Sequence, residues 1–189
     1  MEYPNWFAMG AQYYFNTHLF LYADKSLKCL QIGAYTGDAT CWLFENILRN
    51  PNSTLTDVDT WEGSDEPAHH DLNWQSVEQA YDAKTLIYQQ EKRLVKRKMT
   101  SDDFFKEDKG SFDFIYIDGD HKALSVLKDA SNAIMRLKPK GILAFDDYTW
   151  SLGKGPEFDP KPAIDAILVC AKNEFTVLEI GHQVWLQKN

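Results

Sequence analysis

Cysteine is scarce in this sequence, and long apolar runs are missing. The cysteines are odd in number and lie in apolar surroundings at Cys29, Cys41 and Cys170, which favours reduced, buried thiols over a disulfide framework or a zinc site. No apolar run has transmembrane length, and the N-terminus lacks the basic start and continuous apolar core of a signal peptide. We therefore expect a cytoplasmic protein without membrane-spanning segments.

Basic residues are outnumbered by acidic ones, with 20 Lys and Arg against 28 Asp and Glu and a formal net charge of −8. Binding to a nucleic-acid backbone or to an anionic membrane surface requires clustered positive charge, so neither partner is expected. The one basic cluster, at 92–98, is followed by acidic residues and is typical of a solvated helix end.

From residue 28 onward, short apolar runs alternate with segments of helical periodicity, which predicts repeated strand–helix units. We expect helices at 38–48, 77–96, 122–137 and 163–171, and strands at 28–34, 54–61, 96–100, 111–118 and 142–147. Two further strands lie within 174–188 on either side of Gly181 and His182. Their short connection requires them to be antiparallel.

These elements predict an α/β fold with a Rossmann-like, doubly wound sheet of seven strands, mostly parallel and ending in a C-terminal antiparallel hairpin. A length of 189 residues, 44% of them hydrophobic, suits one domain over 1–189. Within it we expect an N-terminal helical segment at 1–27. The stretch 62–90, whose polar first half contains His69, His70 and Trp74, is interpreted as a lid or substrate insertion.

The turn after the first strand contains Gly33 and Gly37 and opens directly into a helix. Glycines allow a ligand to approach the main chain, and a helix N-terminus offers free N–H groups. A dinucleotide loop would have glycine at position 35, where Tyr35 instead obstructs a pyrophosphate, so the spacing disfavours NAD. A turn with a purely structural role remains the alternative.

The second strand ends in two aspartates about twenty residues beyond the glycine turn, a distance at which a carboxylate reaches ribose hydroxyls. Asp59 is the better candidate because it ends the strand, although Asp57 remains possible. Trp61 is either an apolar wall for an adenine ring or part of the core.

Carboxylates also follow the fourth and fifth strands, at Asp118, Asp146 and Asp147. If these strands are neighbours, the three like charges need a cation to offset their repulsion, and oxygen ligands suit Mg²⁺. His121, at the start of the next helix, is a candidate general base. The alternative is that one aspartate caps the helix and another is solvated, and Asp120 is a good N-cap candidate.

Four stretches in this order and spacing resemble the motifs of class I S-adenosylmethionine (SAM)-dependent methyltransferases, specifically the small O-methyltransferase-like group called methyltransferase family 24. The stretches are LQIGAYTGDAT (30–40), LTDVDTWEG (55–63), FDFIYIDGDH (112–121) and LKPKGILAFDDY (137–148), and the C-terminal IGHQVWLQK also fits. The resemblance implies catalytic roles for Asp118 and His121 and metal ligands at Asp118, Asp146 and Asp147. It also implies SAM contacts from Gln31, Gly33, Ala34, Tyr35, Thr36, Gly37, Asp59, Thr60, Trp61, Ser101 and Asp118.

The function that this resemblance implies is transfer of a methyl group from SAM to a hydroxyl of a small, sugar-like or polyhydroxylated molecule, with or without the assistance of Mg²⁺. The chain departs from the family at Met99-Thr100, where relatives often have Gly-Asp before the serine that contacts adenine. A SAM-binding protein of the same fold without transfer activity is therefore the main alternative. An NAD-binding protein is disfavoured by Tyr35.

Overall fold

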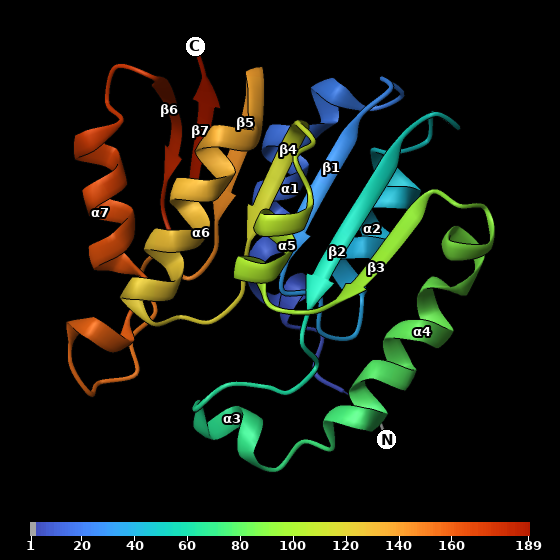
Figure 1. The fold of residues 1–189 in the computed structure, drawn as a ribbon, viewed down its shortest axis with the longest axis horizontal. Coiled ribbons are helices and arrows are strands. Elements are labelled where there is room, and N and C mark those ends of the chain that lie inside the picture. Colours follow the sequence, from blue (N-terminus) through green and yellow to red (C-terminus); the bar gives the residue numbers. More distant parts are fainter. Residues whose placement is uncertain (1–2) are drawn as a thin grey trace.

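The structure is a computed structural model that describes residues 3–189 (Figure 1). Its single described sheet has the strand order β3-β2-β1-β4-β5-β7-β6, in which β7 alone runs opposite to the other strands. The strands are β1 (Lys28–Ile32), β2 (Thr54–Asp59), β3 (Leu94–Lys98), β4 (Phe112–Ile117), β5 (Leu137–Phe145), β6 (Phe175–Ile180) and β7 (Val184–Lys188). This arrangement confirms the predicted fold class.

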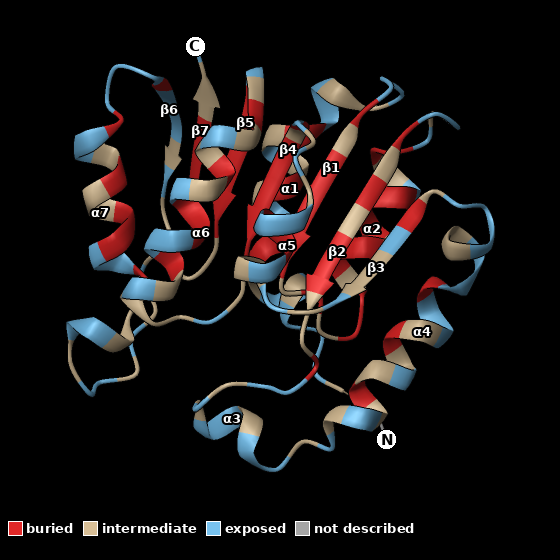
Figure 2. Ribbon diagram, in the orientation of Figure 1, coloured by how far each residue is buried: buried red, intermediate tan, exposed pale blue. Residues whose placement is uncertain are grey.

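Helices cover both faces of the sheet, and two separate apolar clusters result. One face packs against α1 (Gln12–Leu19), α2 (Asp38–Asn46) and α4 (Trp74–Gln90), and the other against α5 (Ser101–Glu107), α6 (Ala123–Arg136) and α7 (Lys161–Cys170). The short helices are η1 (Phe7–Ala11), η2 (Phe20–Tyr22), α3 (Pro67–His70) and η3 (Pro156–Phe158). Because β1, β4 and the second half of β5 (141–145) are covered on both sides, they are mostly apolar and buried (Figure 2).

The N-terminal helix α1 is part of the core. Phe15 is fully buried and meets the rings of Trp42, Phe114, Tyr116 and Trp185 edge to face at centroid distances of 4.9–5.7 Å. Edge-to-face pairing is favourable for aromatic rings beyond the area that they bury. One side chain of α1 therefore joins α2, β4 and β7.

The predicted helix at 77–96 is wrong at its C-terminal end. Helix α4 ends at Gln90, Lys92 adopts a positive φ of 58°, and β3 begins at Leu94. The basic cluster thus lies on an edge strand rather than at a solvated helix end. The Lys96 amine is 2.8 Å from Glu78 and 2.7 Å from Asp82 on α4, so acidic partners neutralise it.

Helix α5 was not predicted, although its N-terminus has a recognisable pattern. The Thr100 hydroxyl accepts a hydrogen bond from the Asp103 backbone N–H at 3.1 Å, as an N-cap does. Strand β5 also begins earlier than expected, at Leu137 directly after α6, because the chain continues in extended form through Pro139.

The cysteines are free in the structure, but only Cys29 is buried. Cys41 is half-buried and Cys170 is exposed, so the prediction of three buried thiols is wrong for Cys170, which lies at the end of α7. Among the described residues, no helix combines the length and the apolar character needed to cross a membrane.

Candidate active site

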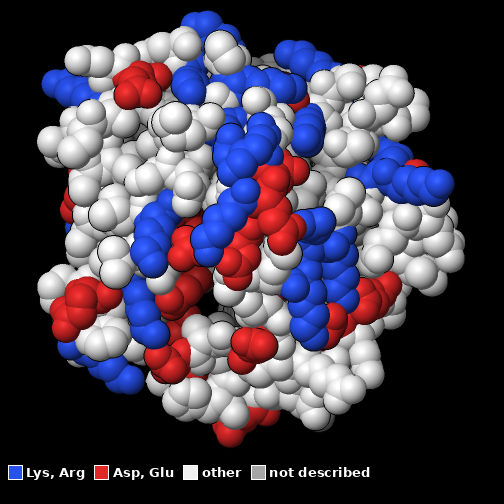
Figure 3. Space-filling view, viewed as in Figure 1, with Lys and Arg blue, Asp and Glu red and all other residues white. Residues whose placement is uncertain are grey.

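A cavity of about 860 Å³ opens at the carboxyl ends of β1, β2, β4 and β5. Its volume is in the range of small-molecule sites, and its location is where parallel α/β sheets bind ligands. Acidic side chains gather beside the hollow in the surface (Figure 3), and the cavity wall contains many more acidic than basic residues. Such a cavity favours neutral or cationic ligands over anions.

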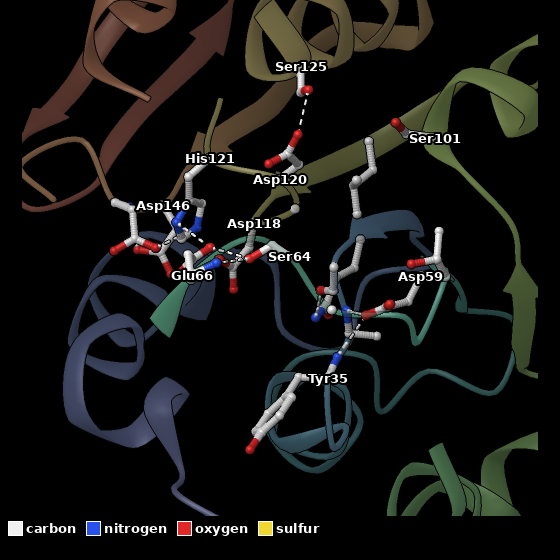
Figure 4. Close-up of a pocket in the computed structure, with 18 of the residues that line it drawn as sticks. Tyr35, Asp59, Ser64, Glu66, Ser101, Asp118, Asp120, His121, Ser125 and Asp146 are labelled. Atoms are coloured by element: carbon white, nitrogen blue, oxygen red, sulfur yellow. Dashed lines mark hydrogen bonds and ion pairs between the residues drawn. The ribbon is translucent and has the colours of Figure 1, made fainter. Parts of the chain in front are cut away.

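The glycine turn and Asp59 form one end of the cavity (Figure 4). One carboxylate oxygen of Asp59 accepts hydrogen bonds from the backbone N–H groups of Ala34 and Tyr35, at 2.7 and 3.0 Å. The other oxygen accepts from the Trp61 N–H at 2.7 Å. Asp59 therefore holds the turn after β1 and its own strand end together at the cavity wall.

Asp57, the alternative to Asp59, points into the helical layer instead. It is fully buried and accepts hydrogen bonds from the hydroxyls of Thr40, at 2.6 Å, and Tyr81, at 2.8 Å. Burial raises the pKa of Asp57 to about 7, although these two hydrogen bonds act in the opposite direction. This side chain joins β2 to α2 and α4 and does not line the cavity.

The residues expected to contact a cofactor divide into two groups. Those that line the cavity are Gln31, Gly33, Ala34, Tyr35, Asp59, Thr60, Ser101 and Asp118. Thr36, Gly37 and Trp61 lie behind the wall, where the Trp61 indole N–H donates to the Tyr35 carbonyl at 2.9 Å and its ring is only 2% exposed. Trp61 is thus in the core in this structure, where it supports the turn.

Gln31 is a buried polar side chain on the cavity wall. Its amide nitrogen donates to the Gly33 carbonyl at 2.8 Å, while its Oε1 has no hydrogen-bond partner within residues 3–189. An unpaired buried acceptor is costly unless a ligand or water pairs with it. Gln31 Oε1 is therefore available to a hydrogen-bond donor inside the cavity.

Parallel pairing of β4 with β5 brings the carboxylates at their ends together. Asp118, His121 and Asp147 each offer a ligand atom, all within 4.8 Å of one another, and Asp146, Asp147 and His182 form a second such group. We name these five residues the carboxylate rim. Burial, then the charges of Asp146 and Asp147, raise the pKa of Asp118 well above its usual value.

Asp146 is the most completely hydrogen-bonded of these carboxylates. It accepts from the Tyr116 hydroxyl, from the Gln183 amide at 3.0 Å and from the Asp147 N–H at 2.8 Å. The grouping by distance places His121 with Asp118 and Asp147, whereas the sequence prediction placed Asp146 with them. Asp147 belongs to both groups and has a positive φ of 56°, a strained conformation of the kind found at functional sites.

His121 lies between two carboxylates, with Nε2 3.0 Å from Asp147 Oδ2 and Nδ1 3.2 Å from Glu66 Oε1. Burial lowers its pKa, but the hydrogen bond and charge of Asp147 and the charge of Glu66 outweigh that effect, so the pKa is raised overall. The indole of Trp150 packs against the imidazole at a centroid distance of 4.7 Å. Asp120 accepts from the Lys122 N–H and the Ser125 hydroxyl, while the N-cap position itself is Lys122.

Two parts of this site were missed from the sequence. His182, in the β6–β7 turn, lies 3.4 Å from Asp147 Oδ1 and is bonded through Nδ1 to the Thr149 hydroxyl at 2.7 Å. Trp6, from the N-terminal segment, stacks on Tyr35 at 4.5 Å and closes the cavity from the side. The hairpin prediction places His182 in a turn, but it does not show that β7 pairs with β5, which is what brings His182 to Asp147.

A family model described as a methyltransferase domain (Methyltransf_24) matches residues 30–148, which contain the glycine turn, Asp59 and most of the carboxylate rim. The chain belongs to this methyltransferase family. No curated protein sequence matches it.

Solved structures of the same fold include several methyltransferases. An O-methyltransferase from Bacillus cereus, solved with SAH, shares 16% identity with a TM-score of 0.60, over 85% of this chain and 74% of that one. SMU.1697c, a putative methyltransferase from Streptococcus mutans solved with SAH, shares 13% identity with a TM-score of 0.67, over 94% and 97%. TomG, an O-methyltransferase of tomaymycin synthesis from Streptomyces achromogenes, was solved with SAM. It shares 13% identity with a TM-score of 0.62, over 86% of this chain and 73% of that one. At these identities the likeness shows the fold alone.

Proposed function

We propose that this methyltransferase binds SAM at the glycine-turn end of the cavity and transfers its methyl group to a hydroxyl of a small, polyhydroxylated molecule at the carboxylate rim. Two features support the cofactor. Asp59 is at the wall where a ribose would lie, and the unpaired Gln31 Oε1 can accept a hydrogen bond from the cofactor's ammonium group. The structural neighbours from B. cereus, S. mutans and S. achromogenes also bind SAM or SAH.

The carboxylate rim fits a hard divalent cation. Asp118, Asp146 and Asp147 offer only oxygen ligands. Burial and then the charges of neighbouring carboxylates raise the pKa of Asp118 and Asp146, and a cation would offset that repulsion. When bound, Mg²⁺ would stabilise the negative charge that develops on the acceptor oxygen. His121 and His182 lie close enough to these oxygens that a metal with nitrogen ligands is also compatible.

The side chains of the rim would then carry out the proton transfer. In its neutral form His121 accepts the proton of the acceptor hydroxyl. Nε2 lies 3.0 Å from Asp147 Oδ2 in this structure, so this contact would have to open before Nε2 could take that proton. As this O–H bond breaks, the oxygen forms a bond to the methyl carbon and the bond from that carbon to sulfur breaks, which releases SAH. Most of the rate enhancement would come from positioning both reactants in one enclosed cavity.

The single observation that carries this proposal is the convergence of Asp118, His121 and Asp147 within 4.8 Å at one end of a cavity whose other end is formed by the glycine turn and Asp59. Binding of SAM alone would require only the end formed by the glycine turn and Asp59. Transfer to a hydroxyl also requires a proton acceptor and a cluster of carboxylates, which the other end of the cavity provides.

The test is formation of SAH from SAM with catechol, glycerol and hexoses as acceptor probes, with added Mg²⁺ or with EDTA. We expect His121→Ala to lower turnover by about 100-fold or more, the usual contribution of a general base. His70→Ala is the matched control, because His70 is exposed and does not line the cavity. Activity that is unchanged both by EDTA and by His121→Ala would contradict the proposal. Tight SAM binding without SAH formation would support the alternative, a SAM-binding protein without transfer activity.

A further inference from the structure

The N-terminal segment, residues 6–11, forms one wall of the cavity and differs in chemistry from the rest of it. Its residues on that wall carry no charge, and they are Trp6, Phe7, Met9, Gly10 and Ala11. The remaining wall is rich in aspartate and glutamate. All five residues lie outside the stretch 30–148 that the family model matches, so the family likeness assigns them no role.

This N-terminal wall connects the two ends of the cavity. At one end, the indole of Trp6 stacks on Tyr35 of the glycine turn, with ring centroids 4.5 Å apart and an interplanar angle of 26°. At the other end, Gly10 lies beside His182, since a Cβ added at Gly10 would be 3.8 Å from the imidazole. An acceptor that lies between the cofactor and the carboxylate rim would therefore contact this wall.

The backbone of the N-terminal wall is fixed by the core. Phe7, the residue after Trp6, packs against Phe15 at a centroid distance of 5.0 Å and against Trp42 at 5.8 Å. The Asn5 side-chain oxygen accepts a hydrogen bond from the Ala8 N–H at 2.8 Å, which closes the first turn. Trp6 is thus held at the cavity although 37% of its surface remains exposed.

We infer that Trp6 is a specificity-determining residue whose indole receives the flat face of a ring-shaped acceptor, while a hydroxyl on the edge of that ring reaches the carboxylate rim. This inference rests on the proposed function. It narrows the acceptor from any polyhydroxylated molecule to one that contains a six-membered ring with an apolar face. An aromatic ring and the C–H face of a sugar share this chemistry.

A second aromatic ring beside Trp6 favours a flat acceptor. The imidazole of His69, which also lines the cavity, lies 5.6 Å from the indole at an angle of 42°. His69 is held by the Ser64 hydroxyl, 2.8 Å from Nδ1, and by the ring of Trp74, which meets it edge to face at 5.0 Å. Trp6 and His69 therefore form an aromatic corner on a wall that is otherwise built from short or apolar side chains.

The chemistry of this corner distinguishes ring-shaped from open-chain acceptors. Stacking on an indole is favourable for an apolar ring face, beyond the area that it buries. An acyclic polyol has no such face, and its hydroxyls would lose water against Trp6 without gaining hydrogen bonds. The acidic remainder of the cavity would instead pair with the hydroxyls on the edge of the ring.

The test measures binding of three acceptor probes in the presence of SAH. Catechol supplies an aromatic ring, methyl glucoside a saturated ring and glycerol an open chain. We expect Trp6→Ala to weaken binding of catechol, methyl glucoside or both by about 3- to 10-fold, the range of an aromatic contact. Binding of glycerol should change by less than about twofold. A loss for one ring probe alone would identify which kind of ring the site prefers.

Two variants separate this contact from a structural role. Trp6→Phe should restore most of the affinity for the ring probe, because it keeps an aromatic face. Tyr13→Ala is the matched control, since Tyr13 is an aromatic residue of α1 that is 68% exposed and does not line the cavity. It should leave the affinity for all three probes within about twofold of the wild type. The calorimetric Kd for SAM should change by less than about threefold in every variant.

Unchanged affinity for both ring probes in Trp6→Ala would overturn the inference, as would the absence of binding by either ring probe. Equal weakening for glycerol and the ring probes would also overturn it, because it would show a general disturbance of the cavity. These binding measurements do not require methyl transfer. Trp6-dependent binding of a ring probe without SAH formation from SAM would support the inference and contradict the proposed function. SAH formation that depends on His121 but not on Trp6 would do the reverse.

Discussion

Gly33 is the position at which a single methyl group should damage this fold most clearly. Its φ is 85°, and a Cβ added there would lie 1.8 Å from the carbonyl oxygen and 2.5 Å from the carbonyl carbon of Asp118. Neither backbone can move away freely. The Gly33 N–H donates to the Val58 carbonyl at 2.9 Å, and the Asp118 N–H donates to the Ile32 carbonyl at 2.8 Å.

The expected cost of Gly33→Ala has two parts. A left-handed conformation costs an alanine about 1–2 kcal/mol, and forcing a methyl group into a packed site costs about 1–3 kcal/mol, so the free energy of unfolding should fall by about 2–5 kcal/mol. Gly153→Ala is the matched control, because Gly153 has a similar φ of 71° but no atom within 4 Å of the added Cβ. Only the conformational cost, about 1–2 kcal/mol, applies there.

Urea unfolding followed by tryptophan fluorescence measures both variants against the wild type. The argument predicts that Gly33→Ala loses more stability than Gly153→Ala by at least about 1 kcal/mol, the low end of the packing cost. Equal losses in the two variants would refute it. They would mean that the end of β1 and the end of β4 can separate without cost, and that the cavity wall is less rigid than the structure indicates.

Three further substitutions test the core and the cavity wall. Phe15→Ala should lower the free energy of unfolding by about 3–5 kcal/mol in urea titrations, because it removes the ring that joins α1 to the sheet. Asp59→Ala should weaken SAM binding in calorimetry by about tenfold or more, since it releases the two N–H groups of the glycine turn, whereas Asp57→Asn should change it by less than about threefold. The folded-state pKa of Asp57, about 7, lies above its ordinary value of 3.8, so its stabilising contribution is complete below pH 4 and is lost as the pH rises toward 7. Asp57→Asn should therefore make the free energy of unfolding fall less between pH 4 and pH 7 than in the wild type, and an unchanged pH dependence would contradict the assignment.

Local patterns determined the fold class. The apolar runs of β1, β4 and β5 are long enough to be read as buried strands, and the helical periodicity between them requires parallel connections. Parallel pairing then places every strand's carboxyl end at one edge, which is why Asp118, Asp146 and Asp147 could be grouped before the structure was known. The C-terminal end of α4 and the presence of α5 were harder to predict from the sequence, because the charged residues of β3 fit a helix and an edge strand equally well.

Side-chain direction was decided by packing. Asp57 and Asp59 are two residues apart and point to the same face of an ideal strand, yet Asp57 is buried against α2 and α4 while Asp59 reaches the cavity, because Asp59 ends the strand and turns toward the glycine loop. Trp61 adopts a positive φ of 50° that directs its ring into the core. No local pattern distinguishes that outcome from a ring exposed in the cavity.

The sequence by itself determined the sheet, its order of elements and the edge at which the site lies, because these follow from hydrophobic periodicity and the geometry of parallel strands. Only the tertiary structure brought Glu66 beside His121 and His182 beside Asp147. Glu66 is 55 residues from His121 along the chain, on a polar connection whose path depends on Pro67, Ser64 and the pair with Lys122. His182 reaches Asp147 because β7 pairs antiparallel with β5, with Val184 opposite Phe145. Contacts of this kind depend on how separate segments pack together, which no local pattern of residues contains.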